Sequence, residues 1–252
     1  MDSLLKTDVF LTEWIHKNIG MNKNPVISKM PYYLGLLPYE LYVLPGMFVA
    51  IFAMFYYKTF HPVQFHLLPH WFAFSISLYI KHNVHRTRPG CAHPKTMGHL
   101  IDPNHCLGKT KFESFPSGHT IIAFTLATTL HMYLTDPTYE KKDKSFLGID
   151  FSNDTIKNIT IGFAYLVAIM ISIHRVSYGY HHVSDVLVGA IMGYAIGFTS
   201  YSITNLARGV QLADKTEEQI WFYIRIFGCI ASVLAILHFF VFKFHKLSML
   251  QH

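Results

Sequence analysis

Charged residues are scarce in this chain of 252 residues, since Asp, Glu, Lys and Arg make up only 14% of it. Soluble domains usually carry about 25% charged residues. Hydrophobic residues make up 51% of the chain, and they gather in long runs rather than in alternating or short amphipathic patterns. The shortage of charge argues against an ordinary soluble domain and favours a membrane protein.

Long basic runs are also lacking, and the formal net charge is +6. We therefore expect no nucleic-acid partner, whereas a modest positive charge suits a protein that faces anionic lipid headgroups. The N-terminus shows neither the basic stretch nor the apolar core of a cleavable signal peptide. Insertion into a membrane is therefore expected to depend on the first hydrophobic run.

Six hydrophobic runs have nearly the length that a bilayer core of about 30 Å requires of a helix. They cover residues 41–57, 62–80, 119–135, 158–173, 186–207 and 226–242, and charged residues flank them. Any one run alone could be a core helix of a soluble protein. Together they predict an all-α fold, a polytopic membrane helical bundle of about six transmembrane helices, built as a single domain over residues 1–252.

Residues 3–19 are predicted to form a helix that is too polar to cross a membrane. Its apolar arc includes Leu11 and Trp14, and its polar stripe includes Lys6 and Lys17. This pattern is typical of a helix in the plane of the membrane interface, so residues 1–35 are predicted to form an interfacial segment. An ordinary surface helix docked on protein fits the pattern equally well.

Polar residues gather at the ends of three hydrophobic runs, where they are unfavourable unless they serve a function. The clusters cover residues 81–89, 114–119 and 175–185. The second run ends at the first cluster, and the third run begins at the second. The chain then crosses the membrane twice more before it reaches the third cluster, so all three are predicted to meet at one membrane surface.

The three clusters together have the chemistry of a site for a tetrahedral oxyanion. Lys81, Arg88 and Arg175 supply three cations, and the planar fork of arginine matches phosphate oxygens. Ser117 and Gly118 precede a helix start, where free N–H groups favour an anion. Taken singly, each residue has a structural explanation, such as a cation that reaches toward the headgroups or a helix N-cap.

A histidine nucleophile completes this interpretation. His181 and Asp185 are four residues apart, so a helix places both on one face. The carboxylate can hold one ring nitrogen and leave the other free to attack phosphorus, while His119 can protonate the leaving oxygen. His181 and His182 could instead form a metal pair, but neighbouring residues point in different directions on a helix and the sequence offers no evident third ligand.

The clusters resemble the three signature motifs of the type 2 phosphatidic acid phosphatase superfamily. One position departs from the third motif, because His174 stands where the family usually has serine. The matches are Lys81, Arg88 and Pro89 for Lys-x6-Arg-Pro; Pro116, Ser117, Gly118 and His119 for Pro-Ser-Gly-His; and Arg175, His181 and Asp185 for Ser-Arg-x5-His-x3-Asp.

The resemblance implies a catalytic region over residues 81–185 and a phosphohistidine intermediate at His181, with His119 as acid and later as base. It implies no metal and no other cofactor, and it assigns phosphate binding to Lys81, Arg88, Ser117, Gly118 and Arg175. The expected substrate is a lipid phosphate, such as phosphatidic acid or lysophosphatidic acid, or a polyprenyl diphosphate in the bilayer.

Three alternatives share the motifs, and the oligomeric state stays open. The first is a phosphatase of a soluble sugar phosphate, such as glucose 6-phosphatase. The second is a vanadium-dependent haloperoxidase, against which six predicted spans argue. The third is a catalytically silent membrane scaffold or transport protein that keeps the pocket.

Two of the three cysteines bear on the orientation in the membrane. Cys91 and Cys106 bracket most of the loop between the first two motifs, and in an oxidising compartment we expect them to form a disulfide. In a reducing compartment they would be free thiols. Once the phosphate-binding cations are discounted, the two faces carry nearly balanced positive charge, whereas the superfamily's usual placement implies an extracytoplasmic or lumenal active face.

Overall fold

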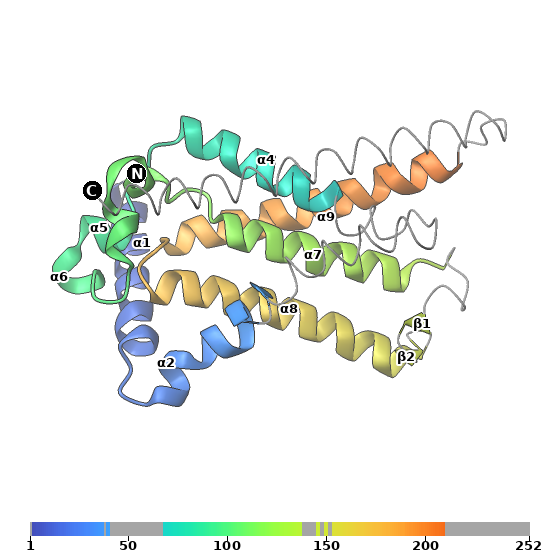
Figure 1. Cartoon of the computed structure of the whole chain (residues 1–252), viewed down its shortest axis with the longest axis horizontal. Coiled ribbons are helices and arrows are strands. Elements are labelled where there is room, and N and C mark those ends of the chain that lie inside the picture. The colour runs from blue at the N-terminus through green and yellow to red at the C-terminus, as the bar shows by residue number, and fades with distance from the viewer. Residues whose placement is uncertain are drawn as a thin grey trace, which may run out of the picture.

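The computed structural model describes residues 2–37, 39–40, 68–137, 145–146, 149–150 and 153–209. The fold is all-α, and a hairpin of two residues per strand is the only sheet among these residues (Figure 1). The elements are α1 (Asp2–Ile15), η1 (His16–Gly20), α2 (Pro25–Pro31), η2 (Tyr32–Leu36), α4 (Leu68–Asn83), α5 (Pro89–Ala92), α6 (Pro94–Met97), η4 (Pro103–Cys106), η5 (Gly108–Phe112), α7 (Gly118–Thr135), β1 (Ser145–Phe146), β2 (Ile149–Asp150), α8 (Asp154–Ser177) and α9 (Val183–Gly209).

Four long helices, α4, α7, α8 and α9, run along the length of the molecule, and α7 contacts the other three (Figure 1). Helix α7 begins after Ser117, whose backbone is extended, and ends at Asp136. Pro137 follows, and the residue before a proline disfavours the helical conformation. Helix α8 begins after Asn153, whose side chain accepts hydrogen bonds from Thr155 N at 2.9 Å and Ile156 N at 3.3 Å, as a helix N-cap does.

Glycines let α9 approach α7 closely. Gly189, Gly193 and Gly197 are spaced by four residues and face α7. A Cβ atom at Gly193 would lie 2.4 Å from the Ile121 carbonyl oxygen, and Thr125 Oγ1 donates to the Gly193 carbonyl at 3.1 Å. Stripes of small residues with this spacing are typical of packed membrane helices.

Large hydrophobic side chains point outward from α8 and α9. Phe163 is 55% exposed and Ile191 is 70% exposed. Two described stretches, Asp154–Ser177 and Val183–Ile203, are long and apolar enough to cross a membrane. They contain or overlap the predicted runs 158–173 and 186–207.

The other predicted runs have different outcomes. Run 119–135 coincides with α7, while the described part of run 62–80 is helical from Leu68 and continues to Asn83. Runs 41–57 and 226–242 lie outside the described residues. The all-α class is therefore confirmed, whereas the number of membrane crossings stays a prediction.

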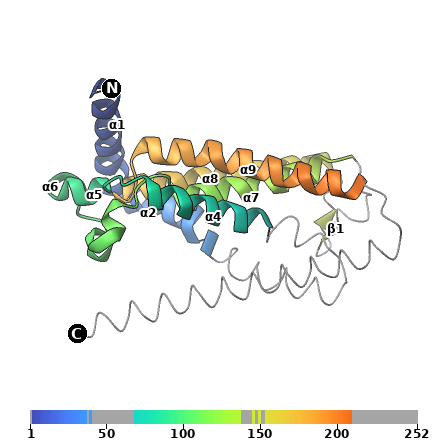
Figure 2. The same cartoon turned by 90° about the horizontal axis from the view of Figure 1, so that it is seen from above.

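Helix α1 crosses the end of the bundle where α8 ends and α9 begins (Figure 2). The helix predicted over residues 3–19 exists, but its α-helical part ends at Ile15 and one π-helical turn, η1, continues to Gly20. Trp14 is 54% exposed, whereas Thr12 and His16 face the protein and are buried.

Candidate active site

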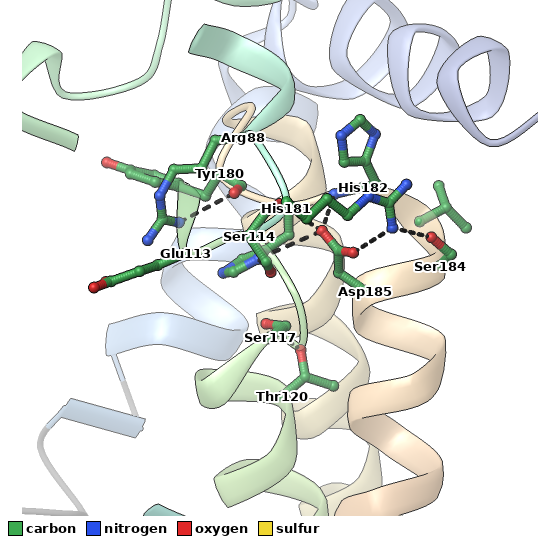
Figure 3. Close-up of polar contacts among 12 residues, drawn as sticks. Arg88, Glu113, Ser114, Ser117, Thr120, Tyr180, His181, His182, Ser184 and Asp185 are labelled. Carbon is green, nitrogen blue, oxygen red and sulfur yellow. Dashed lines mark hydrogen bonds and ion pairs between the residues drawn. The ribbon is translucent and has the colours of Figure 1, made fainter. Parts of the chain in front are cut away.

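The three predicted clusters meet at one end of the bundle. The last residues of α4 and α8 and the first residues of α7 and α9 come together there (Figures 1 and 3). Hydrogen bonds join the clusters: Ser114 N donates to the Arg86 carbonyl at 3.0 Å, and Ser117 N donates to the Asp185 carbonyl at 3.1 Å. Lys81 Nζ donates to the carbonyl of Glu113, next to the second cluster, at 3.0 Å. The ends of separate helices are thus held in one local network.

His181 lies at the centre of this network and is only 1% exposed. Its Nδ1 is 2.6 Å from the Ser114 carbonyl oxygen. A carbonyl can only accept, so Nδ1 carries the proton and Nε2 keeps its lone pair. The Asp185 carboxylate was expected to hold this ring nitrogen, but its Oδ2 atom is farther away, at 3.8 Å. The carbonyl therefore orients the ring, and the carboxylate acts on it across a longer gap.

Asp185 is fully buried and accepts three short hydrogen bonds (Figure 3). Ser114 Oγ donates to Oδ2 at 2.6 Å, and His182 N donates to the same oxygen at 2.8 Å. Arg86 Nη1 lies 2.5 Å from Oδ1. Hydrogen bonds and a paired cation favour the charged carboxylate despite its burial. A fixed negative charge therefore lies beside His181.

The three predicted phosphate-binding cations surround this histidine. Arg88 donates to the Thr110 carbonyl at 2.8 Å and to the Tyr180 carbonyl at 3.1 Å. The Arg175 guanidinium lies 3.9 Å from the centre of the Tyr180 ring. Among the described residues, the buried Nε of Arg175 has no hydrogen-bond partner. A buried donor of this kind is suited to an incoming acceptor such as phosphate.

The electrostatic setting keeps His181 neutral. Burial lowers the pKa of His181 well below its usual value, and the positive charges of Lys81, Arg175 and Arg88 lower it further. The hydrogen bond to the Ser114 carbonyl acts in the opposite direction. A neutral imidazole has a free electron pair on Nε2, which is the form that a nucleophile needs.

The Pro-Ser-Gly-His segment forms the entry to α7. Ser117 is fully buried, and its Oγ accepts a hydrogen bond from Thr120 Oγ1 at 3.0 Å (Figure 3). A Cβ atom at Gly118 would lie 3.9 Å from Cε of Lys81, so the lysine lies against the helix start. The first N–H groups of a helix lack intrahelical acceptors and form its positive end. The arrangement can therefore receive an anion.

Comparison with known proteins agrees with this chemistry. Residues 67–208, more than half of the chain, match the family model of the PAP2 superfamily. The chain belongs to the PAP2 superfamily. The resemblance stated from the motifs is thus confirmed.

A curated relative has a more specific name. The chain is 34% identical over 109 residues to "Probable lipid phosphate phosphatase 4" of Arabidopsis thaliana. The match covers 43% of this chain and 33% of the plant protein, so it spans about a third of that relative's length. No solved structure matches the chain.

Within this PAP2 chain, His174 replaces the usual serine of the third motif. It is buried, and its ring stacks on Tyr178 with 4.2 Å between the ring centroids. The imidazole thus extends an aromatic group beside Arg175.

No three His, Cys, Asp or Glu side chains of the described segments are grouped as metal ligands.

The disulfide expected in an oxidising compartment is present in the structure. Cys91 and Cys106 are bonded, with their Cα atoms 5.4 Å apart. The bridge closes the loop that contains α6 and most of η4 and that begins shortly after Arg88. It therefore ties together the segment between the first and second motifs.

The sequence interpretation missed three contributors. Arg86 stands inside the first motif at a variable position, and only its contact with Asp185 reveals its importance. Ser114 acts partly through its backbone carbonyl, which any residue possesses. Tyr39 comes from the N-terminal segment, and its ring centroid lies 5.6 Å from that of His119. Only the spacing of cations in the first cluster could have drawn attention to Arg86.

Proposed function

We propose that this chain is an integral membrane phosphohydrolase that removes phosphate from lipid phosphates through a phosphohistidine intermediate at His181. One observation carries the proposal: a buried imidazole whose Nδ1 is occupied by a carbonyl at 2.6 Å and whose environment disfavours protonation. Three cations act together around that imidazole. This combination suits attack on a phosphate group and has no evident use in a purely structural helix end.

The proposed reaction has two steps. Nε2 of His181 forms a bond to phosphorus while the bond from phosphorus to the ester oxygen breaks, and His119 gives that oxygen a proton. Water then attacks phosphorus while the bond from phosphorus to Nε2 breaks, and the water transfers a proton to His119. The products are the dephosphorylated lipid and inorganic phosphate, and the enzyme returns to its starting protonation state.

Phosphate binding is assigned to the residues around the nucleophile. Arg175 offers its Nε, which has no hydrogen-bond partner within the described segments, and Lys81 lies against Gly118 at the start of α7. Arg88 and the Ser117–Gly118 turn complete the set. Fixed donors of this kind stabilise charge that develops on the transferring phosphoryl group. Asp185, beside His181, stabilises the positive charge that the ring gains.

The outer surface of the bundle supports a membrane location. Apolar side chains such as Phe163, Ile191 and Ile203 are more than half exposed on α8 and α9, whereas a soluble protein rarely exposes large contiguous apolar surface. The apolar side chains of α1 also face outward. We infer that α8 and α9 cross the bilayer within the predicted bundle of about six spans and that residues 1–35 lie at its interface.

A groove beside Lys81 supports a lipid substrate. The groove has a volume of about 890 Å³. Among the described residues, Leu78, Tyr79 and Phe112 line it next to Lys81. An apolar wall beside a phosphate-binding cation suits a molecule with a hydrophobic tail and an anionic head. The name of the Arabidopsis relative points the same way.

The disulfide supports the orientation of the site. Cys91 and Cys106 lie in the loop that leads from the first motif to the second. Disulfides persist in oxidising compartments. We therefore place the active end on the extracytoplasmic or lumenal side.

The test is phosphate release by the full chain in detergent micelles. Phosphatidic acid, lysophosphatidic acid, a polyprenyl diphosphate and glucose 6-phosphate are compared as substrates. The proposal expects turnover of at least one lipid, with glucose 6-phosphate turned over far more slowly. Faster turnover of the sugar phosphate would favour a sugar phosphatase, and no turnover of any of them would refute the proposal.

The mechanism is tested separately on the nucleophile. His181→Ala should abolish turnover and the acid-labile labelled phosphoenzyme, while the exposed His93→Ala serves as the matched control. Activity should persist in a chelator, because fixed cations neutralise the phosphate. Vanadate should inhibit, since it adopts the geometry of the transferring phosphoryl group. Near-normal activity in His181→Ala, with loss in His182→Ala, would reassign the nucleophile.

A further inference from the structure

Helix α1 presents a polar face to the protein and an apolar face outward. Asp8, Thr12 and His16 are spaced by four residues, so they lie on one side of the helix and of the turn that follows it. The side chain of Asp8 is 11% exposed, and Thr12 and His16 are almost fully buried. Phe10 and Trp14, on the other side, are 65% and 54% exposed. The polar face therefore has a specific partner within the protein.

That partner is the junction between α8 and α9. The Asp8 carboxylate accepts a hydrogen bond from Ser184 N at 2.9 Å, and Thr12 Oγ1 accepts one from Val183 N at 3.1 Å. Both N–H groups belong to the first turn of α9, where a helix lacks acceptors of its own. His16 Nδ1 donates to the Ser177 carbonyl, at the end of α8, at 2.7 Å. Helix α1 thus caps α9, although more than 170 residues separate them in the sequence.

Arg86 extends this contact to the proposed active site. Its Nη2 lies 2.5 Å from Oδ2 of Asp8, and its Nη1 lies 2.5 Å from Oδ1 of Asp185. Nη1 also donates to Ser184 Oγ at 2.6 Å. One planar guanidinium therefore bridges a carboxylate on α1 and the carboxylate beside His181. Such a fork holds two acceptors in a fixed relative position, which a lysine cannot do.

We propose that Asp8 is a positioning residue for the phosphatase site, acting through Arg86 on Asp185 while it caps the first turn of α9 together with Thr12. This inference rests on the proposed function. Asp8 contacts neither the reacting phosphate nor His181 in that mechanism. Its effect reaches the chemistry because it fixes the guanidinium and the helix turn that hold Asp185.

The charge order supports this role. Asp8, Arg86 and Asp185 form an alternating row of negative, positive and negative groups. Burial raises the pKa of Asp8, but hydrogen bonds from Ser184 and Arg86 outweigh it, and its pKa lies below the usual value. The carboxylate therefore stays charged at neutral pH. Without that charge, Arg86 would lose one of its two ion pairs, and the hydrogen bonds from Ser184 to Asp8 would weaken.

The first test compares Asp8→Asn with Glu13→Gln in the full chain in detergent micelles. Both changes remove one negative charge from α1, but only Asp8 forms ion pairs and hydrogen bonds through its side chain; within the described segments, the Glu13 side chain forms neither. We expect kcat for phosphatidic acid to fall roughly 10-fold in Asp8→Asn, the order of a lost hydrogen bond to a charged group. KM should stay within about twofold, and Glu13→Gln should match the wild type.

A second pair of variants distinguishes loss of the hydrogen bond that caps α9 from a general loss of folding. Thr12→Val keeps the shape of the side chain but loses the hydroxyl, whereas Thr12→Ser keeps the hydroxyl. Thr12→Val should lower kcat several-fold, and Thr12→Ser should restore it. This pair keeps the inference testable even if Asp8→Asn fails to fold.

The decisive measurement is coupling between Asp8 and Arg86. Arg86→Lys keeps the charge but cannot bridge both carboxylates. If Asp8 acts through Arg86, adding Asp8→Asn to Arg86→Lys should cause little further loss of kcat. Fully additive losses, or an unchanged kcat in Asp8→Asn, would overturn the inference while leaving the phosphatase proposal intact. A folded wild type that hydrolyses none of the phosphates would refute both.

Discussion

Replacing Asp185 by asparagine separates two roles that a carboxylate can have beside a catalytic histidine. In many His–Asp pairs the carboxylate holds the ring in the correct tautomer. Here the Ser114 carbonyl, 2.6 Å from Nδ1, does so. Asp185→Asn should therefore leave the Nδ1–H tautomer in place and remove mainly the negative charge.

The size of the effect follows from the distance. In the proposed mechanism His181 becomes positively charged when Nε2 bonds to phosphorus, and Oδ2 of Asp185 lies 3.8 Å from Nδ1. With an effective dielectric constant of about 20, a full charge at that distance is stabilised by about 4 kcal/mol. Since only part of the charge has developed in the transition state, we expect the rate of phosphoenzyme formation to fall about 10²- to 10³-fold.

The assay is rapid-quench measurement of phosphoenzyme formation with labelled substrate, with the melting temperature recorded in parallel. Asp154→Asn is the matched control, because Asp154 is an exposed carboxylate in the first turn of α8 that pairs with Lys157. Unchanged phosphoenzyme formation in folded Asp185→Asn would refute the electrostatic role. A loss explained entirely by unfolding would refute it as well.

Three further predictions follow from the fold. Replacing Cys91 and Cys106 by serine should lower the stability by roughly 3 kcal/mol in the chain-entropy model, and thiol labelling of both cysteines without reductant would contradict the bridge. Gly193→Ala should destabilise the chain by about 1–3 kcal/mol in thermal melting, because its Cβ would meet backbone. Gly162→Ala, whose Cβ would meet no atom of the described residues within 4 Å, should leave the stability equal or slightly higher, because alanine favours a helix. Equal losses in the two variants would contradict the packing argument. Because the pKa of His181 is depressed, kcat/KM should stay constant as the pH falls through about 6.5 and decline only at lower pH. The unfolded chain binds a proton at His181 more readily than the folded chain, so the stability should fall as the pH drops below about 6.5. A loss of kcat/KM that already begins above about pH 6.5 would contradict the assignment of His181.

Much of the site was predictable because its side chains carry distinctive chemistry. Lys81, Arg88, Arg175 and His181 stand at the ends of hydrophobic runs, and counting helix crossings brought them to one end. The starts of α7, α8 and α9 fall within five residues of the predicted runs. Helix length and end positions therefore contain most of the information about where the clusters meet.

The remaining contacts depend on backbone atoms and on distant segments. The acceptor for His181 is a main-chain oxygen, so no residue type marks it. The amphipathic pattern of α1 predicted an interfacial helix, but it did not show that its polar side docks on the start of α9. That contact depends on how α1 crosses the bundle, and local periodicity does not determine the crossing.

The glycine stripe of α9 has a consequence for how the proposed lipid substrate would reach the site. Gly189 faces the Ser117 carbonyl and Gly197 faces the Thr125 carbonyl, so backbone meets backbone along the seam. Short side chains such as Thr120 and Thr128 also line this seam. Opening the seam would separate Ser117 from Asp185, whose main-chain atoms are hydrogen-bonded. The α7–α9 interface therefore stays closed, and under the proposed function the acyl chain of a lipid phosphate would enter and leave between other helices.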